Sequence, residues 1–247
     1  MNQESPSGDR FSISYATMRK FVGWLGLSLP FILPAGFVIF FSRHGFPGSI
    51  SGYYYTGMRN YLVAALCVLG VLFIGYDAYS DKLDFWITNL AGIFAVGVAF
   101  FPTSPAAASP HQQNIGHIHF VFAALLFTTL AIMALRFTKT NPDSDSTSQK
   151  SRRNVIYIFC AVLIAASMLM AFIANFLPVA IKQGMPSLFW FEAIAVIAFS
   201  VSWLVKGAAF PVLNDKPSVA VQPQPEPSEF DTSDRDRPLA PGAASAG

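Results

Sequence analysis

The sequence predicts an all-α integral membrane protein, a bundle of six transmembrane helices with both termini in the cytoplasm. Three observations support this prediction. Of the 247 residues, 53% are hydrophobic and only 12% are charged, whereas soluble domains carry about 25% charged residues. Six apolar stretches come close to the roughly 20 residues that a helix needs to cross a bilayer. Lys and Arg residues are concentrated between alternate stretches, which orients the bundle.

The six apolar stretches lie at about residues 21–41, 61–76, 85–101, 117–135, 155–176 and 188–205. The first contains Pro30 and Pro34, which predict a kink because each proline removes a backbone hydrogen-bond donor. Trp24 and Trp203 fall near the cytoplasmic ends of their helices. Because indole rings are enriched at the membrane interface, we expect both to lie in an aromatic belt.

Polar segments divide the chain into three parts. Residues 1–20 form a cytoplasmic N-terminal segment, residues 21–207 the transmembrane domain, and residues 208–247 a disordered cytoplasmic tail. The tail is rich in Pro, Ala, Ser and acidic residues, and the segment 138–151 is rich in Ser, Asp and Lys. Neither segment buries enough apolar surface to offset the entropy of an ordered chain, so we expect both to be disordered.

The distribution of basic residues predicts the orientation. With the N-terminus in the cytoplasm, thirteen of the 16 Lys and Arg residues fall on the cytoplasmic side, and only Arg43, Arg59 and Lys182 fall on the other. Cytoplasmic loops carry an excess of Lys and Arg. We therefore expect the protein in the cytoplasmic (inner) membrane.

The net charge and the positions of the cysteines exclude some kinds of partner and bond. A net charge of +2 does not indicate a nucleic-acid partner. Cys67 and Cys160 both lie in apolar runs, where they are expected to pack as small hydrophobic residues rather than form a disulfide. The expected partner is membrane lipid. A homo-oligomer is compatible with the sequence, and no protein partner is indicated.

Polar residues near the outer ends of the helices form the candidate site. In the predicted topology they share one membrane face, where they would bind a lipid headgroup or a small ligand. They come from the loop after the first helix, from the start of the fourth helix and from the sixth helix: Ser51, Tyr53, Tyr55, Arg59, Asn114, His117, His119 and Glu192. The three consecutive tyrosines also fit an interfacial aromatic belt.

Glu192 is the most informative of these residues, because Phe189, Trp190 and Phe191 precede it. A lone carboxylate among aromatic rings must take up a proton or find a cationic partner. Arg59 and a protonated His117 or His119 are the candidate partners. A buried pair that fixes helix packing and a ligand-binding or catalytic carboxylate both remain open.

His117, His119 and Glu192 are also candidate ligands for a divalent metal such as zinc. A zinc site needs at least three ligands. Side chains at i and i+2 of a helix point about 200° apart, so the two histidines would share a metal only at an extended or frayed end. The sequence contains no compact motif such as His-Glu-x-x-His.

Several short stretches of the sequence are similar to segments of a known protein family. They are Ser51-Gly-Tyr-Tyr-Tyr-Thr-Gly-Met-Arg59, Gly75-Tyr-Asp, Asn89-Leu-Ala-Gly-Ile-Phe-Ala, Phe101-Pro-Thr, Ile118-His-Phe, Phe191-Glu-Ala-Ile-Ala and Ser202-Trp-Leu-Val-Lys-Gly. Together, over residues 49–207, they resemble a family of uncharacterised bacterial six-helix multi-pass membrane proteins, a domain of unknown function. The resemblance implies six helices and an inner-membrane location, and it implies no activity. A more distant likeness to putative membrane hydrolases related to alkaline ceramidases lacks their seven helices and paired-histidine spacing.

Three functions follow from these observations. The leading one is a multi-pass membrane protein, not evidently an enzyme, whose outer polar residues stabilise the bundle or bind a lipid headgroup or small ligand. The first alternative is a metal-dependent hydrolase acting on lipid at the outer face, with His117, His119 and Glu192 holding the metal or its water. The second is a small-solute transporter, which would need polar residues through the midplane.

Overall fold

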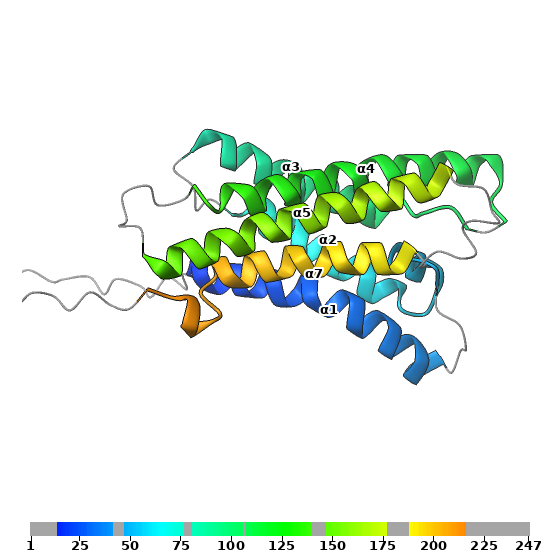
Figure 1. Cartoon of the computed structure of the whole chain (residues 1–247). Helices are drawn as coiled ribbons and strands as arrows, with labels where there is room; N and C mark the ends of the chain where they lie inside the picture. The colour runs from blue at the N-terminus through cyan, green and yellow to red at the C-terminus, as the bar shows by residue number, and fades with distance from the viewer. Residues whose placement is uncertain are drawn as a thin grey trace, which may run out of the picture. The chain divides into compact units, whose positions relative to one another are not determined.

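The structure is a computed structural model that describes residues 14–41, 47–76, 81–105, 107–139, 147–176 and 188–215. It contains long helices joined by short segments and two short 3₁₀ helices, and no strand occurs among these residues (Figure 1). The helices are α1 (Tyr15–Phe41), η1 (Ser51–Tyr55), α2 (Arg59–Ile74), α3 (Lys82–Phe100), α4 (Pro110–Arg136), α5 (Ser148–Phe176), α7 (Leu188–Lys206) and η2 (Pro211–Leu213). The all-α prediction is confirmed for this part of the chain.

Five of the helices, α1, α3, α4, α5 and α7, are long and apolar enough to cross a membrane. Helix α2 has 16 residues, which at 1.5 Å per residue gives about 24 Å, less than the roughly 30 Å of a bilayer core. Large apolar side chains face outward on the helices, among them Phe40 (75% exposed), Val71 (67%) and Phe159 (61%). An exterior of this kind suits lipid, so the chain is a multi-pass membrane protein.

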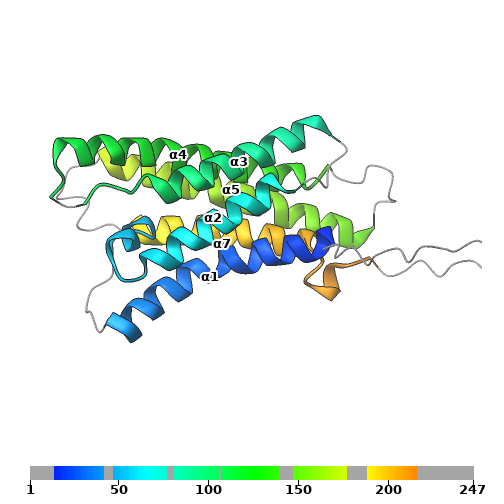
Figure 2. The same cartoon turned by 180° about the vertical axis from the view of Figure 1, so that it is seen from behind.

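The six long helices that the structure describes form a closed ring, in which each packs against the next described helix. Helix α1 contacts α2, followed by the pairs α2–α3, α3–α4, α4–α5 and α5–α7, and α7 returns to α1. Both views show the helices running lengthwise beside one another (Figures 1 and 2). Neighbouring helices run in opposite directions (Figure 1). Of the six described long helices, α1, α3 and α5 therefore begin at one end of the ring, and α2, α4 and α7 begin at the other.

Glycines allow the closest approaches in this ring. A Cβ built on Gly92 of α3 would lie 2.7 Å from the carbonyl oxygen of Gly70 on α2, and one built on Gly26 of α1 would lie 2.6 Å from Ser200 Oγ on α7. Small residues are typical of helix contacts in membranes, because close packing replaces the hydrophobic driving force that lipid removes. Helix α1 continues through Pro30 and Pro34 and bends away from its neighbours in its second half (Figures 1 and 2).

At one end of the ring, an ion-pair cluster joins α3 to α4. Arg136, in the last turn of α4, pairs with Asp81 and Asp84. Asp81 is the N-cap of α3, and its carboxylate accepts a hydrogen bond of 3.0 Å from the Leu83 amide. That bond and Arg136 hold the pKa of Asp81 below its ordinary value. Both aspartates lie at the start of α3, where a negative charge is favourable beside the helix dipole, and they share one arginine from α4.

Three predicted helix starts came about two turns too late. The first helix begins at Tyr15, not near residue 21. The fourth helix begins at Pro110, not near residue 117, because Ser109 and Gln112 form a capping box and Pro110 occupies the first turn. The fifth helix begins at Ser148, so the end of the segment predicted to be disordered is helical. Residues 140–146 of that segment, the N-terminal residues 1–13 and the tail from 216 onward lie outside the described residues.

The sequence predicted Trp203 in an interfacial aromatic belt, and the structure shows that this prediction was wrong. Its side chain is fully buried and contacts the rings of Phe73, Tyr76 and Phe137 at centroid distances of 5.4, 5.2 and 5.5 Å. Trp24 is 58% exposed. An aromatic cluster from α2, α4 and α7 thus fills the interior at one end of the ring, where the sequence position of Trp203 alone suggested lipid contact.

Candidate functional site

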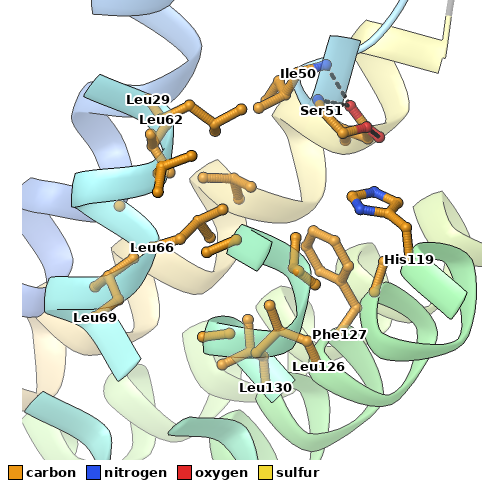
Figure 3. A pocket seen from close by; sticks show the side chains of 18 of the residues that line it. Leu29, Ile50, Ser51, Leu62, Leu66, Leu69, His119, Leu126, Phe127 and Leu130 are labelled. Carbon is orange, nitrogen blue, oxygen red and sulfur yellow. Dashed lines mark hydrogen bonds between the residues drawn. The ribbon is translucent and has the colours of Figure 1, made fainter. Parts of the chain in front are cut away.

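A cavity of about 80 Å³ lies inside the ring, with walls from α1, α2, α3, α4 and α7. Almost all of its lining side chains are apolar. Ser51 and His119 lie at one end, and Leu69 and Leu130 lie toward the other (Figure 3). The polar lining groups are Ser51, Tyr54, His119 and Glu192. The cavity is therefore amphipathic, because most of its wall is apolar and one end carries polar groups.

Glu192, in the second turn of α7, supplies the carboxylate at the polar end. It accepts hydrogen bonds from the backbone amide of Ile50, from the Ser51 amide at 3.4 Å and from the Ser51 hydroxyl at 3.0 Å. These donors stand at the start of η1, where amides have no partner within the helix. A further bond of 2.8 Å, from the Phe189 amide to the Gly48 carbonyl, holds the same loop against α7.

A cationic partner was one of the two possibilities for Glu192, and Arg59, its first candidate, turns elsewhere. Arg59 donates a hydrogen bond of 3.0 Å to the Tyr54 hydroxyl and stacks over the same ring, with 4.4 Å between the guanidinium carbon and the ring centroid. Among the described residues, no ion pair to Glu192 is found. Backbone amides and a hydroxyl take the place of a cation, which sequence spacing does not reveal.

His119 reaches the same cavity from α4. Its side chain is buried, and 2.6 Å separates Nδ1 from the Phe101 carbonyl oxygen just after α3. Because a carbonyl only accepts, Nδ1 carries the proton in this bond. The bond fixes the imidazole at the polar end of the cavity, on the same side as Ser51 (Figure 3).

His117 and Asn114 are exposed on α4 and do not line the cavity. The separation of His117 from buried His119 follows from the helical rotation of about 200° between i and i+2. Among the described residues, no group of three or more His, Cys, Asp or Glu is placed to hold a metal ion. The proposed set of His117, His119 and Glu192 is thus not brought together by this arrangement.

The two remaining candidates, Tyr53 and Tyr55, differ in environment. Tyr53 is fully buried between Phe37 and Phe189, with ring centroids 5.9 and 6.4 Å away, and burial raises the pKa of its hydroxyl. Tyr55 is 48% exposed and donates to the Thr103 carbonyl at 2.6 Å. Only the second fits the predicted interfacial belt, and neither lines the cavity.

The structure also identifies residues that the sequence did not single out. Tyr54 lies at the polar end, and the apolar walls include Leu62, Leu66, Leu126 and Phe127. A signal for Tyr54 existed in the three consecutive tyrosines. No signal marked the leucines, because in so apolar a chain every helix carries many of them.

Residues 39–207 match the sequence model of a family described as "Protein of unknown function (DUF998)". The chain belongs to the DUF998 family. The predicted membership in an uncharacterised domain family is therefore confirmed. No curated protein and no solved structure matches the chain.

The DUF998 match covers the end of α1 and all of α2 to α7 in the described residues. It thus includes Ser51, His119 and Glu192, which form the polar end of the cavity. The DUF998 description names no activity.

Proposed function

We propose that this DUF998 protein binds a single-chain amphiphile of the membrane, with the hydrocarbon chain in the cavity and a hydroxyl or amine head at Glu192. The observation that carries this proposal is the apolar cavity that ends at a carboxylate. At about 10–15 Å³ for each water-sized sphere, 80 Å³ has room for about five to eight of them. A slender chain fits this space better than a bulky ring system.

The chemistry of the polar end determines the head group. A carboxylate has about four lone-pair positions, and the donors of Ile50 and Ser51 approach Glu192 from the η1 side. A ligand that donates a hydrogen bond or carries a positive charge would use a remaining position. A fatty-acid carboxylate would place a second negative charge beside Glu192, which is unfavourable in a site of low dielectric.

We further propose that α2 crosses the membrane as a sixth span and that both termini are cytoplasmic, in an inner membrane. One end of the ring carries most of the basic residues described: Arg19, Lys20, Lys82, Arg136, Lys139, Lys150, Arg152, Arg153 and Lys206. The opposite end carries Arg59. The positive-inside rule then supports placing Glu192 and the polar end of the cavity at the outer face.

A comparison of three ligands with the same chain tests the binding proposal. Purified protein would be titrated in detergent with octylamine, octanol and octanoate, and binding measured by thermal shift and native mass spectrometry. We expect the amine and the alcohol to bind and octanoate to bind more weakly. Glu192→Gln should remove the preference for the amine over the fatty-acid carboxylate, since the negative charge of Glu192 is lost while a hydrogen-bond acceptor remains.

Two leucine variants separate cavity binding from adsorption to the protein surface. Leu66→Phe fills the cavity, whereas Leu135→Phe makes the same change at a side chain that is 46% exposed on α4. Binding should be lost in the first variant and retained in the second. Equal binding of all ligands to both variants would contradict the proposal.

Metal-dependent lipid hydrolysis and solute transport, the alternatives suggested by the sequence, have no comparable observation in their favour among the described residues. His117 does not line the cavity, and the cavity walls below Ser51 and His119 are apolar (Figure 3). A midplane solute pathway would need polar side chains there.

A further inference from the structure

A second cavity, of about 380 Å³, lies at the opposite end of the ring from Glu192. Four cationic side chains line it, from three helices: Arg19 of α1, Lys150 and Arg153 of α5, and Lys206 of α7. One acidic residue, Asp215, lines it as well. Among the described residues, four positive charges against one negative charge make this pocket strongly basic.

Contacts to the backbone and to tyrosine hold the cations in place. Arg19 donates through Nε to the Tyr76 hydroxyl, and another nitrogen of its guanidinium lies 3.4 Å from the Lys206 carbonyl oxygen. Arg153 donates to the Leu213 carbonyl at 2.6 Å. Neutral partners of this kind position a positive charge without cancelling it, so the site is organised before any anion binds.

Asp215 balances only part of this charge. It pairs with Arg153 at 2.8 Å, and hydrogen bonds from Thr147 and Arg153 hold its pKa below its ordinary value, so it is ionised at neutral pH. Arg19 and Arg153 both repel the Lys206 ammonium. Repulsion between like charges in a partly buried space is relieved by a bound anion.

We propose that this pocket binds a phosphate group, carried by an anionic membrane lipid or by a soluble phosphate compound. Arginine and lysine are the residues that recognise phosphate, arginine through two parallel hydrogen bonds and lysine as a point charge. Basic pockets between transmembrane helices on the cytoplasmic side are a recurrent form of anionic-lipid site. The site is distinct from the Glu192 cavity and does not depend on the function proposed for it.

The surroundings favour a lipid as the source of the phosphate. Phe21 and Trp24 of α1, within two turns of Arg19, are 57% and 58% exposed, and Val155, two residues after Arg153 on the outer side of α5, is 64% exposed. Apolar side chains directed outward next to a basic pocket allow an acyl chain to lie along the helices while its phosphate is held between them.

The test uses the full chain in detergent, with thermal shift and native mass spectrometry as readouts. Phosphatidylglycerol, phosphatidylcholine and inorganic phosphate would be added separately to wild type, to the double variant Lys150→Gln with Lys206→Gln, and to Arg152→Gln. Arg152 is the matched control, because it is an exposed cation on the same turn of α5 that does not line the pocket. Both pocket lysines are replaced rather than Arg19, whose contacts to Tyr76 also support folding.

We expect phosphatidylglycerol to stabilise wild type and Arg152→Gln and to bind the double variant about tenfold more weakly or worse, since each basic residue near the surface contributes to binding an anionic lipid. Phosphatidylcholine should have little effect. A shift with inorganic phosphate alone, lost in the double variant, would support the site with a soluble source. Equal binding of phosphatidylglycerol to wild type and the double variant, or equal effects of both lipids, would overturn the proposal.

Discussion

At the scale of single residues, Glu192 shows how a carboxylate is accommodated in an apolar helix without a cation. Its partners are the amides of Ile50 and Ser51 and the Ser51 hydroxyl, about 140 residues earlier in the chain. An amide whose acceptor is removed costs about 1–3 kcal/mol when it stays buried. The carboxylate therefore ties the loop before η1 to α7 and also presents an acceptor to the cavity.

Asp84 and Arg136 form a contrasting pair, a true ion pair near the basic end. Their side chains are 11% and 18% exposed, whereas Asp81, the second partner of Arg136, is 54% exposed. Removing one partner of a buried pair leaves an uncompensated charge and costs about 3–5 kcal/mol, while an exposed pair contributes about 0–1 kcal/mol. The two aspartates should differ accordingly.

We predict that Asp84→Ala lowers the free energy of unfolding by about 3 kcal/mol, because Arg136 then lacks its buried partner. Asp81→Ala should cost about 1 kcal/mol, mainly through the lost N-cap. Thermal unfolding in detergent would measure both. Replacing Asp84 and Arg136 together by Leu and Met should recover part of the loss, and equal losses for the two aspartates would contradict this prediction.

At the scale of the helices, close backbone contacts fix the packing. Gly70 and Gly92 face each other across α2 and α3, where a Cβ on either would lie 3.0 or 2.7 Å from the other's carbonyl oxygen. A backbone oxygen cannot move aside as a flexible side chain can. A side chain here must separate the two helices.

We predict that Gly92→Ala destabilises the protein by about 1–3 kcal/mol, the usual cost of overpacking. Gly48→Ala is the matched control, because no atom lies within 4 Å of its built Cβ. The midpoint of thermal aggregation in detergent would compare the two. If both variants behaved like wild type, the close α2–α3 contact would be refuted.

The end of α7 shows a second constraint on backbone. Ala208 has a φ of 55°, in the left-handed region, and the Ala209 amide bonds back to the Leu204 carbonyl at 3.0 Å. Helices commonly end this way with glycine at the left-handed position. Here glycine stands one residue earlier, at Gly207, where a Cβ would lie 3.0 Å from the Lys20 amide nitrogen of α1.

We predict that Ala208→Gly stabilises the protein by about 0.5–1 kcal/mol, because relief of the left-handed strain exceeds the added entropy of the unfolded chain. Ala209→Gly, which adds the same entropy without relieving a left-handed residue, should be destabilising. Thermal unfolding of the pair tests the sign. Stabilisation by both substitutions would rule out this explanation.

At the scale of the whole molecule, the ring separates two chemically different ends. One carries the Glu192 cavity and a single described basic residue, Arg59, and the other carries the basic pocket and the Arg136 ion pairs. Because α2 is the shortest of the long helices, the membrane topology depends on whether it crosses completely.

Asn60 lies at the start of α2 and Lys82 at the start of α3, and both are exposed. We predict that the two residues lie on opposite sides of the membrane. Single-cysteine variants at these positions, with Cys67 and Cys160 replaced by Ala, would be treated with a membrane-impermeant maleimide. Asn60→Cys should react in intact cells, and Lys82→Cys only after lysis. Reaction of both in intact cells would show that α2 does not cross.

The class of the protein, the approximate positions of its long helices and its family could be predicted from the sequence alone. These depend on composition and on the length of apolar stretches, which act locally along the chain. It also singled out Ser51, His119 and Glu192, because polar residues in an apolar chain are conspicuous. It placed Trp203 at the membrane surface, which was wrong because the side chain is buried. For Glu192 it left two possibilities open, a bound proton or a cationic partner, and the described residues show no ion pair to this carboxylate.

Which polar residues meet depends on the tertiary structure. Whether His117 or His119 faces the interior, whether Arg59 turns to Glu192 or Tyr54, and which leucines line a cavity all depend on helix rotation and long-range packing. Apolar side chains are equally stable against lipid and against protein, so hydrophobicity in a membrane helix does not identify its inner face. The cavity at Glu192 and the basic pocket at Arg153 are therefore products of the ring rather than of any local pattern.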